Sequence, residues 1–468
     1  LEAQGRVGGK VHASQVAGVP VDEGAESALA RTSAVADLAG AVGLGQALVA
    51  PATTSAGIYS RGRLHPMPAR QVMGVPADLG ALARTGLLTP AELLRVLADP
   101  VRPGVPIDGD VAVGRLVADR MGQAVVDRLV EPLLGGVYAG HAAQLSLQAT
   151  VPALYDAART TGSLLDAAAR LAPPAPPRRA RQPEVLRPAA AAAPPPRPAP
   201  GFLALSGGLG RLPGAVAAAA RARGVELALG SPVRALRRDP TGWALVVGDA
   251  GGGPDRLVHA DAVVLAVPAG PAARLLAPVA PAVAGLLAGI EYASVGVLTL
   301  AFPATALPER PRGSGMLVPP VEGRLVKAVT FSSAKWGWYA GAAPGMVLVR
   351  LSVGRHGEQG VLDREDADLV RAGLADLAAL TPVRGEPVDA RVTRWHDGLP
   401  QYAVGHVGRV ASIRAQLQAH PGLALAGAAY DGVGVPAVIA TGRAAAQQVL
   451  AGLRWTGRGT TDGEGENG

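Results

Sequence analysis

The sequence has no cysteine and few aromatic side chains among its 468 residues. Without cysteine it forms no disulfide bond, thiolate metal site or iron–sulfur cluster, and it has no cysteine nucleophile. Any redox chemistry must therefore come from a bound cofactor. Aromatic residues make up only 3% of the chain, so few side chains are available to stack on nucleic-acid bases.

The sequence also lacks an apolar run long enough to cross a membrane and a basic surface on a folded domain. The stretches 38–60 and 132–155 carry no charged residue, but glycine, proline and polar residues interrupt both of them. The net charge is +7, and the segment 172–200 alone holds five arginines and one glutamate, so the excess does not mark a folded basic face. We expect no nucleic-acid partner and a location in the cytoplasm, with peripheral contact to a membrane left open.

The composition favours a large globular protein. Hydrophobic residues make up 49% of the chain, which also contains 62 glycines and 41 prolines. This balance is typical of α/β proteins, and the length suits two or three domains. The proline density of 172–200 predicts a linker or mobile insertion, and the polar, glycine-containing segment 456–468 predicts a disordered tail.

Strand and helix patterns alternate through the rest of the chain. Short β-type patterns that predict strands occur at 225–229, 233–237, 243–247 and 262–267. The last of these is continuously apolar and ends at Pro268, which favours a buried parallel strand. Apolar residues recurring at three and four positions predict helices at 90–98, 110–130, 211–223, 363–380 and 436–453.

The first residues read LEAQGRVGGKV and contain the elements of a nucleotide site. Glu2 stands where an acid at a strand end would accept hydrogen bonds from a ribose, and Gly8 and Gly9 would let backbone N–H groups approach a pyrophosphate. Lys10 would neutralise a phosphate. An ordinary strand followed by a glycine turn is the alternative. The GxGxxG loop that usually precedes such an acid is absent, so we expect the sequence to lack the first strand of this fold.

A second glycine-rich segment, LALAGAAYDGVGVPAVIATG, lies near the other end of the chain. It predicts an apolar strand, a turn and a helix that begins near Pro436, whose free N–H groups and positive dipole end would suit an oxygen of a flavin. A plain connection between strand and helix is the alternative. A flavin fold of this kind requires the first and last segments to converge on one cofactor, which favours the functional interpretation.

Several segments together resemble the flavin-dependent protoporphyrinogen and coproporphyrinogen oxidases of heme synthesis, within the wider amine oxidase and phytoene desaturase group. The resemblance is closest to the coproporphyrinogen III oxidase type of Gram-positive bacteria. The segments that carry it are LEAQGRVGGK, VDEGAESAL, RLVEPLLGGVYAG, GSGMLVPPVEG, KAVTFSSAKW, RWHDGLPQY and AGAAYDGVGVP.

The resemblance implies an α/β fold. It consists of a Rossmann-like FAD-binding domain of the amine oxidase (GR2) type, an α+β substrate domain and a helical insertion. The FAD-binding domain would comprise 1–60, 201–275 and 396–455. The substrate domain would comprise 276–395, and the substrate and helical region 61–200 would end in the proline-rich linker.

The resemblance also implies roles for individual residues. Cofactor-binding positions would be Glu2, Ala3, Gly8, Gly9, Lys10, Gly24, Ala25, Glu26, Ser27, Val233, Trp395, Val433, Gly434 and Val435. Substrate-binding positions would be Gly315, Leu317 and Arg350. Each has an alternative: Val233 and Trp395 as core residues, Gly315 and Leu317 as an edge strand, and Arg350 as a solvent-facing residue.

The implied chemistry is transfer of a hydride from a reduced tetrapyrrole to FAD, with loss of an N–H proton. Oxygen would then reoxidise the flavin and give hydrogen peroxide, in three cycles for each porphyrinogen. The sequence shows no Ser/His/Asp set and no metal-ligand spacing, so we assign no catalytic acid or base and no metal. The alternatives are a preference for protoporphyrinogen IX, an amine oxidase or carotenoid desaturase, and a form that does not hold flavin.

Overall fold

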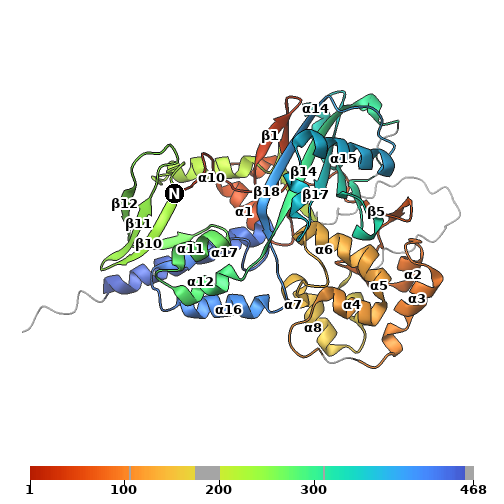
Figure 1. Cartoon of the computed structure of the whole chain (residues 1–468), viewed down its shortest axis with the longest axis horizontal. Helices are drawn as coiled ribbons and strands as arrows, with labels where there is room; N and C mark the ends of the chain where they lie inside the picture. The colour runs from red at the N-terminus through yellow and green to blue at the C-terminus, as the bar shows by residue number, and fades with distance from the viewer. Residues whose placement is uncertain (105–106, 174–200, 309–310, 312, 459–468) are drawn as a thin grey trace, which may run out of the picture.

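The computed structural model describes residues 1–104, 107–173, 201–308, 311 and 313–458. The protein is built from a seven-stranded sheet, a group of helices against one face of that sheet, and a mixed part that contains both ends of the described chain (Figure 1). The predicted proline-rich linker lies outside the described residues beyond Pro173, and the predicted tail lies outside them beyond Arg458.

The mixed part combines short strands with long helices. Its strands are β1 (Ala13–Val16), β2 (Val19–Asp22), β3 (Ala28–Leu29), β4 (Leu48–Val49), β9 (Phe202–Leu205), β10 (Val233–Asp239), β11 (Gly242–Val247), β12 (Arg256–Ala260), β13 (Val263–Leu265) and β19 (Leu423–Leu425). Its helices are α1 (Ala34–Ala41), α10 (Arg211–Arg221), α11 (Ala269–Leu276), α12 (Pro281–Ala288), α16 (His406–Leu417) and α17 (Val435–Arg458). Strand β13 pairs in parallel with β19, and α17 follows β19 and packs against it (Figure 1).

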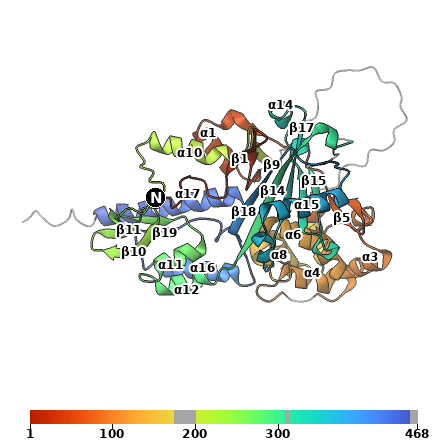
Figure 2. The same ribbon diagram turned by 45° about the horizontal axis from the view of Figure 1, so that its top comes forward.

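The large sheet has the strand order β18-β14-β17-β16-β15-β5-β6. Its strands are β18 (Asp389–Pro400), β14 (Tyr292–Pro303), β17 (Met346–Val353), β16 (Val326–Phe331), β15 (Gly315–Leu317), β5 (Ala56–Ser60) and β6 (Arg63–Pro66). Helix α15 (Asp366–Leu380) covers one face, where Leu369 and Leu377 join a buried cluster with Leu298 and Leu351. Strands β14 and β18 extend from the sheet toward the mixed part (Figure 2). The short helices α13 (Ser332–Lys335) and α14 (Tyr339–Ala342) connect β16 to β17.

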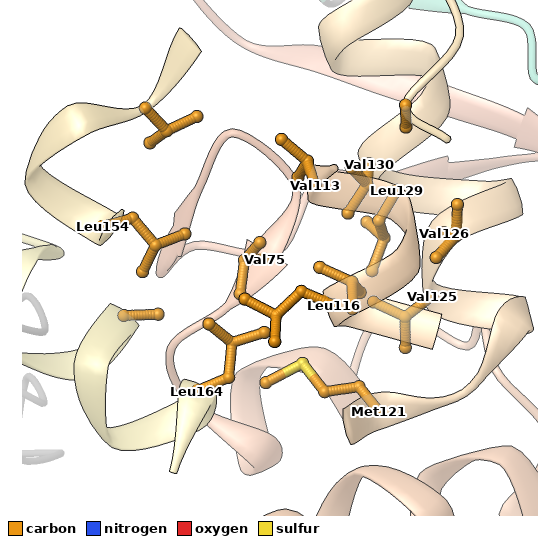
Figure 3. Packing of buried hydrophobic residues seen from close by; sticks show 14 of the residues in the cluster. Val75, Val113, Leu116, Met121, Val125, Val126, Leu129, Val130, Leu154 and Leu164 are labelled. Atoms are coloured by element: carbon orange, nitrogen blue, oxygen red, sulfur yellow. The ribbon is translucent and has the colours of Figure 1, made fainter. Parts of the chain in front are cut away.

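The opposite face of the sheet meets the helical group through α6 (Glu131–Tyr138), which contacts β15 and β16. The other helices are α2 (Leu79–Ala83), α3 (Pro90–Leu97), α4 (Val113–Met121), α5 (Gln123–Val125), α7 (Leu147–Thr150), α8 (Pro152–Thr160) and α9 (Leu164–Leu171), with a π-helical turn at Val126–Val130 and a hairpin of β7 (Gln71–Val72) and β8 (Val75–Pro76). Side chains such as Leu116, Leu129 and Leu154 interlock in its core (Figure 3). This core gives α6 a fixed position above the sheet.

Most predicted elements are confirmed, including the parallel strand at 262–267, which forms β13. The predicted helix 110–130 is divided at Gly122, whose φ of 95° a helix does not allow. The segment 225–229 is assigned no strand, although its backbone pairs with the start of the chain at Glu2. Helix α17 continues to Arg458, past the predicted start of the tail.

The predicted α/β fold class is confirmed, whereas the domain limits stay predictions. Two of the predicted limits fall on strands of the large sheet. The limit at residue 60 coincides with the end of β5, and the limit at residue 395 lies inside β18. Within the described residues, no helix combines the length and the apolarity needed to cross a bilayer.

Arg120 provides a test of the helical group, because it neutralises a carboxylate that is fully buried. Its Nε donates to Asp99 Oδ1 at 2.5 Å, and the other Asp99 oxygen accepts from Ser163 Oγ at 2.7 Å. Arg120→Met leaves this charge without its partner, so we expect the free energy of unfolding to fall by about 3–5 kcal/mol in a denaturant titration. The control Arg371→Met removes an arginine that is 74% exposed and should change it by less than about 0.5 kcal/mol. An equal change in the free energy of unfolding for the two variants would contradict the stabilising pairing of Arg120 with Asp99.

Candidate active site

A glycine turn near the start of the chain packs against the loop that follows β2. Gly8 and Gly9 have φ values of 102° and 54°, which favour glycine. A Cβ on Gly24 would lie 1.8 Å from the carbonyl oxygen of Lys10, so only glycine lets the two segments approach this closely. The structure therefore brings together the predicted positions 8–10 and 24–26.

Glu26 lies at the centre of a cluster of charges. Its carboxylate accepts from Arg350 Nη1 at 2.7 Å and from Lys335 Nζ. Burial favours the neutral acid, but the cations Arg350 and Lys335 outweigh burial and lower the pKa of Glu26 to about 2. Glu26 is therefore a carboxylate at neutral pH, and it fixes the loop to β17 and α13.

The strand register places a row of side chains opposite this loop. Gly315 is paired with Thr330, Thr330 with Arg350, Arg350 with Thr299, and Thr299 with Arg391, across five strands. Directly opposed residues of neighbouring strands project from the same face of a sheet. Arg350 reaches Glu26, and Arg391 Nη1 lies 3.5 Å from Glu23 Oε1, so this face of the sheet meets the loop.

Trp395 follows on the same face of β18. Its Nε1 donates to the carbonyl oxygen of Glu23 at 2.9 Å, and its ring lies next to Gly24. The guanidinium carbon of Arg6 lies 5.9 Å from the ring centroid. Trp395 therefore lies next to the loop that contains Gly24, and its predicted role toward the cofactor stays a prediction.

The glycine-rich turn before α17 converges on the same region. Val435 packs in one apolar cluster with Val11 and Ala25. The turn is held by the hydroxyl of Tyr402, which donates to the Ala428 carbonyl oxygen and accepts from the Gly432 N–H, both at 2.7 Å. Val433 packs against the core of the helical group, and Gly434 is exposed between Val433 and Val435. The two ends of the described chain thus meet, as predicted.

The residues predicted to bind the adenosine part of the cofactor, Glu2 and Val233, form a separate group. The Glu2 backbone bonds to Ala228 and Ser231, which brings it close to Val233 at the start of β10. The Glu2 carboxylate accepts from the Gln4 backbone N–H at 2.8 Å. Ala3 lies in the same short stretch, and Ser27 follows Glu26 directly in the loop. The cofactor roles of these residues stay predictions.

The structure gives two predicted substrate residues, Arg350 and Gly315, contacts within the protein, and their substrate roles stay predictions. The Arg350 side chain is 11% exposed, and its guanidinium binds the Glu26 carboxylate and the Gly24 carbonyl oxygen, so Arg350 is not the solvent-facing residue of the alternative. Gly315 is required for strand packing, since a Cβ there would lie 2.1 Å from the Val329 carbonyl oxygen on β16. Leu317, two residues later, lies beside Gly136 of α6, on the face of the sheet that meets the helical group. Its role in substrate binding stays a prediction.

Sequence reasoning missed four residues of the site: Asp22, Glu23, Lys335 and Tyr402. Asp22 accepts from the backbone N–H groups of Leu209 and Gly210 at the start of α10, and burial raises its pKa to about 6. The acid pair after the apolar VPV of β2 is a local signal for Asp22 and Glu23. Lys335 and Tyr402 have no such signal, because their partners are distant in sequence.

The described residues fit a flavin dinucleotide. The side chain of Lys10 is half-buried, and this burial lowers its pKa. It has no ion-pair or hydrogen-bond partner among the residues that the structure describes. It lies beside the Gly8–Gly9 turn, where a diphosphate would supply the missing charge. Lys10 and this turn would hold the phosphates, and the loop 24–26 with Trp395 would border the ring system.

Comparison with known proteins agrees with this geometry. A family model described as flavin containing amine oxidoreductase matches residues 1–450. Coproporphyrinogen III oxidase from Mycobacterium tuberculosis is 38% identical over 448 residues, 95% of this chain and 89% of the relative. Protoporphyrinogen oxidase from Bos taurus is 29% identical over 354 residues, 73% of this chain and 69% of the relative. A crystal structure from Exiguobacterium sp. matches with a TM-score of 0.77 and 31% identity, covering 97% of this chain and 92% of the other.

The fold and the site define a flavin-dependent oxidoreductase with FAD as its cofactor. The chain belongs to the flavin-containing amine oxidoreductase family. This membership confirms the family resemblance drawn from the motifs.

Glu26 gives a pH-dependent test of the charge cluster. Its pKa is lower in the folded chain than the ordinary 4.5, so its contribution to stability is complete above about pH 4.5 and disappears as the pH falls toward 2. Glu26→Gln leaves Arg350 and Lys335 without their counter-charge, so we expect the free energy of unfolding at neutral pH to fall by about 3–5 kcal/mol. The difference in free energy of unfolding between the two proteins should narrow as the pH falls from about 4.5 toward 2 in urea titrations. A difference independent of pH would contradict the ionised pairing.

Gly24→Ala tests the close approach of the two loops. The added Cβ has to displace the Lys10 backbone, so we expect a loss of stability of about 1–3 kcal/mol and at least a tenfold loss of flavin affinity. Thermal unfolding and flavin absorbance after desalting measure the two effects. Gly40→Ala is a matched control, because Gly40 lies in α1 with open space around it and should be neutral or slightly stabilising. Unchanged flavin content in Gly24→Ala would show that the contact between Gly24 and Lys10 is not needed for flavin binding.

Proposed function

We propose that this chain oxidises coproporphyrinogen III to coproporphyrin III with molecular oxygen as the acceptor. The macrocycle loses six hydrogen atoms in three two-electron oxidations, and three O₂ molecules become three H₂O₂ molecules, so atoms and electrons balance. Bound FAD supplies the two-electron acceptor within the site. The enzyme would act in heme synthesis in the cytoplasm, with peripheral membrane contact still left open.

One observation carries the substrate proposal. The relative of that name from Mycobacterium tuberculosis is 38% identical along nearly the whole chain, so the shared identity is not restricted to the nucleotide motifs. The aligned region covers 95% of this chain, so it includes most of the large sheet as well as the nucleotide motifs.

The chain's own residues would position the macrocycle. Leu317, Ala328 and Ser352 form the next directly opposed row of the sheet after the row of Arg350, on the face that meets α6. These side chains are small or apolar, which suits contact with a flat ring. Glu26 pairs with both Arg350 and Lys335, so these three side chains would fix the loop at the flavin edge.

Protoporphyrinogen IX is the second candidate substrate, favoured by the similarity to the bovine protoporphyrinogen oxidase over 73% of this chain. The two substrates differ in charge, because coproporphyrinogen III carries four propionates and protoporphyrinogen IX carries two. Porphyrin fluorescence can follow both reactions.

We expect the flavin-loaded enzyme to oxidise coproporphyrinogen III with a kcat/KM at least about tenfold above that for protoporphyrinogen IX. The physical reason is the charge-assisted contacts that two further carboxylates can form. Initial rates of porphyrin formation and peroxide release, measured in the same buffer and detergent, test this ratio and the expected stoichiometry of three peroxides for each porphyrin. Autoxidation without enzyme is the blank. A preference for protoporphyrinogen IX would select the second candidate, and no enzyme-dependent porphyrin would refute both.

A further inference from the structure

Lysine is rare in this chain, and its positions are unusual. The sequence has three lysines against 41 arginines. Lys10 lies beside the glycine turn and Lys335 binds Glu26, so two of the three belong to the flavin site described above. The third, Lys327 on β16, is only 8% exposed and has no role in that site.

A β-bulge creates the position of Lys327. Val326 is paired with Val353 and Ala328 with Ser352 on β17, so Lys327 is the extra residue that opposes neither. Val326 and Val353 are fully buried in the core that α15 covers. Bulges of this kind redirect a side chain and are common beside active sites. The register brings Lys327 close to Val353, two residues before Arg355, and the charges that act on the pKa of Lys327 are those of Arg355 and Glu358.

Arg355 is a second buried cation at the same place. It is 6% exposed, and its Nη2 atom is buried without a hydrogen-bond partner among the described residues. Its Nη1 lies 3.4 Å from Glu358 Oε2, and the Glu358 side chain is 42% exposed. The ammonium of Lys327 has no ion pair or hydrogen bond with any residue in the described part of the chain. One exposed carboxylate therefore faces two buried positive charges.

This arrangement costs stability unless an anion completes it. Burial is the main cause that lowers the pKa of Lys327 to about 7, and the positive charge of Arg355 is the second cause. Both disfavour the charged form of a lysine. The C-terminal end of α6 is close, because the His356 N–H donates to the Ala139 carbonyl oxygen. Neither cation binds a carbonyl there within the described residues, so the helix end does not satisfy them.

The two cations also lie at a suitable distance from the flavin loop. Arg350 and Val353 are three residues apart on β17, which is about 10 Å along a strand, and Arg355 follows two residues later. Between them, the row of Leu317, Ala328 and Ser352 crosses the face that meets α6. A flat ring on this row would have one edge near Glu26 and Trp395 and the opposite edge near the cations.

We propose that Lys327 and Arg355 form a carboxylate-binding subsite that holds a propionate of the tetrapyrrole substrate. This inference rests on the proposed function. The bound carboxylate would accept from Arg355 Nη2 and from the Lys327 ammonium, and it would supply the counter-charge that the described residues lack. The two cations are positioning residues, because they act far from the oxidised carbon.

The test measures binding of the product rather than turnover alone. Coproporphyrin III and its tetramethyl ester are titrated by fluorescence into the flavin-loaded wild-type chain and into Lys327→Met, Lys327→Arg and Arg355→Gln. We expect the Kd of the tetra-acid to rise about 10- to 100-fold in Lys327→Met and Arg355→Gln, and to stay within about threefold in Lys327→Arg. The ester should bind all four proteins equally. In turnover, KM should rise while kcat stays within about twofold.

Controls separate a binding role from a structural one. Arg371→Gln removes an exposed positive charge on α15 and should leave both Kd values unchanged. Lys327→Met removes an uncompensated buried charge, so its Tm without porphyrin should stay the same or rise by a few degrees. An unchanged tetra-acid Kd, an equal loss for acid and ester, or a lowered Tm in Lys327→Met would overturn the subsite. Failure of the proposed function appears separately, as a wild-type enzyme that forms no porphyrin.

Discussion

The binding of Glu26 by Arg350 and Lys335 is the interaction on which the site depends. Glu26 belongs to the loop after β2, whereas its two partners come from β17 and α13, more than 300 positions away in the sequence. Three side chains that each lose water on folding are stable together, since every charge has a partner, and unstable separately. The pairing therefore fixes the loop against the sheet in one position, and the glycine contact between Gly24 and Lys10 transmits that position to the turn at Gly8.

Local sequence patterns predicted the fold class and most helices and strands correctly. The apolar run of β13, the periodic pattern of α15 and the start of α17 are determined by residues within a few positions of one another. The two exceptions have different causes. Gly122 interrupts a periodic helix pattern locally, whereas residues 225–229 contact the distant segment at Glu2 without forming a regular ladder.

The candidate site was less predictable, because its residues depend on contacts between distant segments. Gly24 and Gly315 were predicted as cofactor and substrate positions, and the close contacts that they make in the structure are with the Lys10 and Val329 backbones. Arg350 was singled out as a cation beside the site, and nothing near it in the sequence indicates that Glu26 already neutralises it. Lys327 carries no signal in a linear pattern, since its position results from a bulge between two strands.

The long-range nature of these contacts has a consequence for how the protein is made. The hydrogen bond from Trp395 to the Glu23 carbonyl joins residues 372 positions apart, and the turn held by Tyr402 lies still closer to the last described helix. During synthesis, the glycine turn at the start therefore leaves the ribosome long before its partners exist. The turn before α17 packs with Val11 and Ala25, so these contacts form only after the segment up to Val435 has been released from the ribosome. A chain that stops before residue 435 therefore has the glycine turn and the loop after β2 but lacks the apolar contact that joins them to α17.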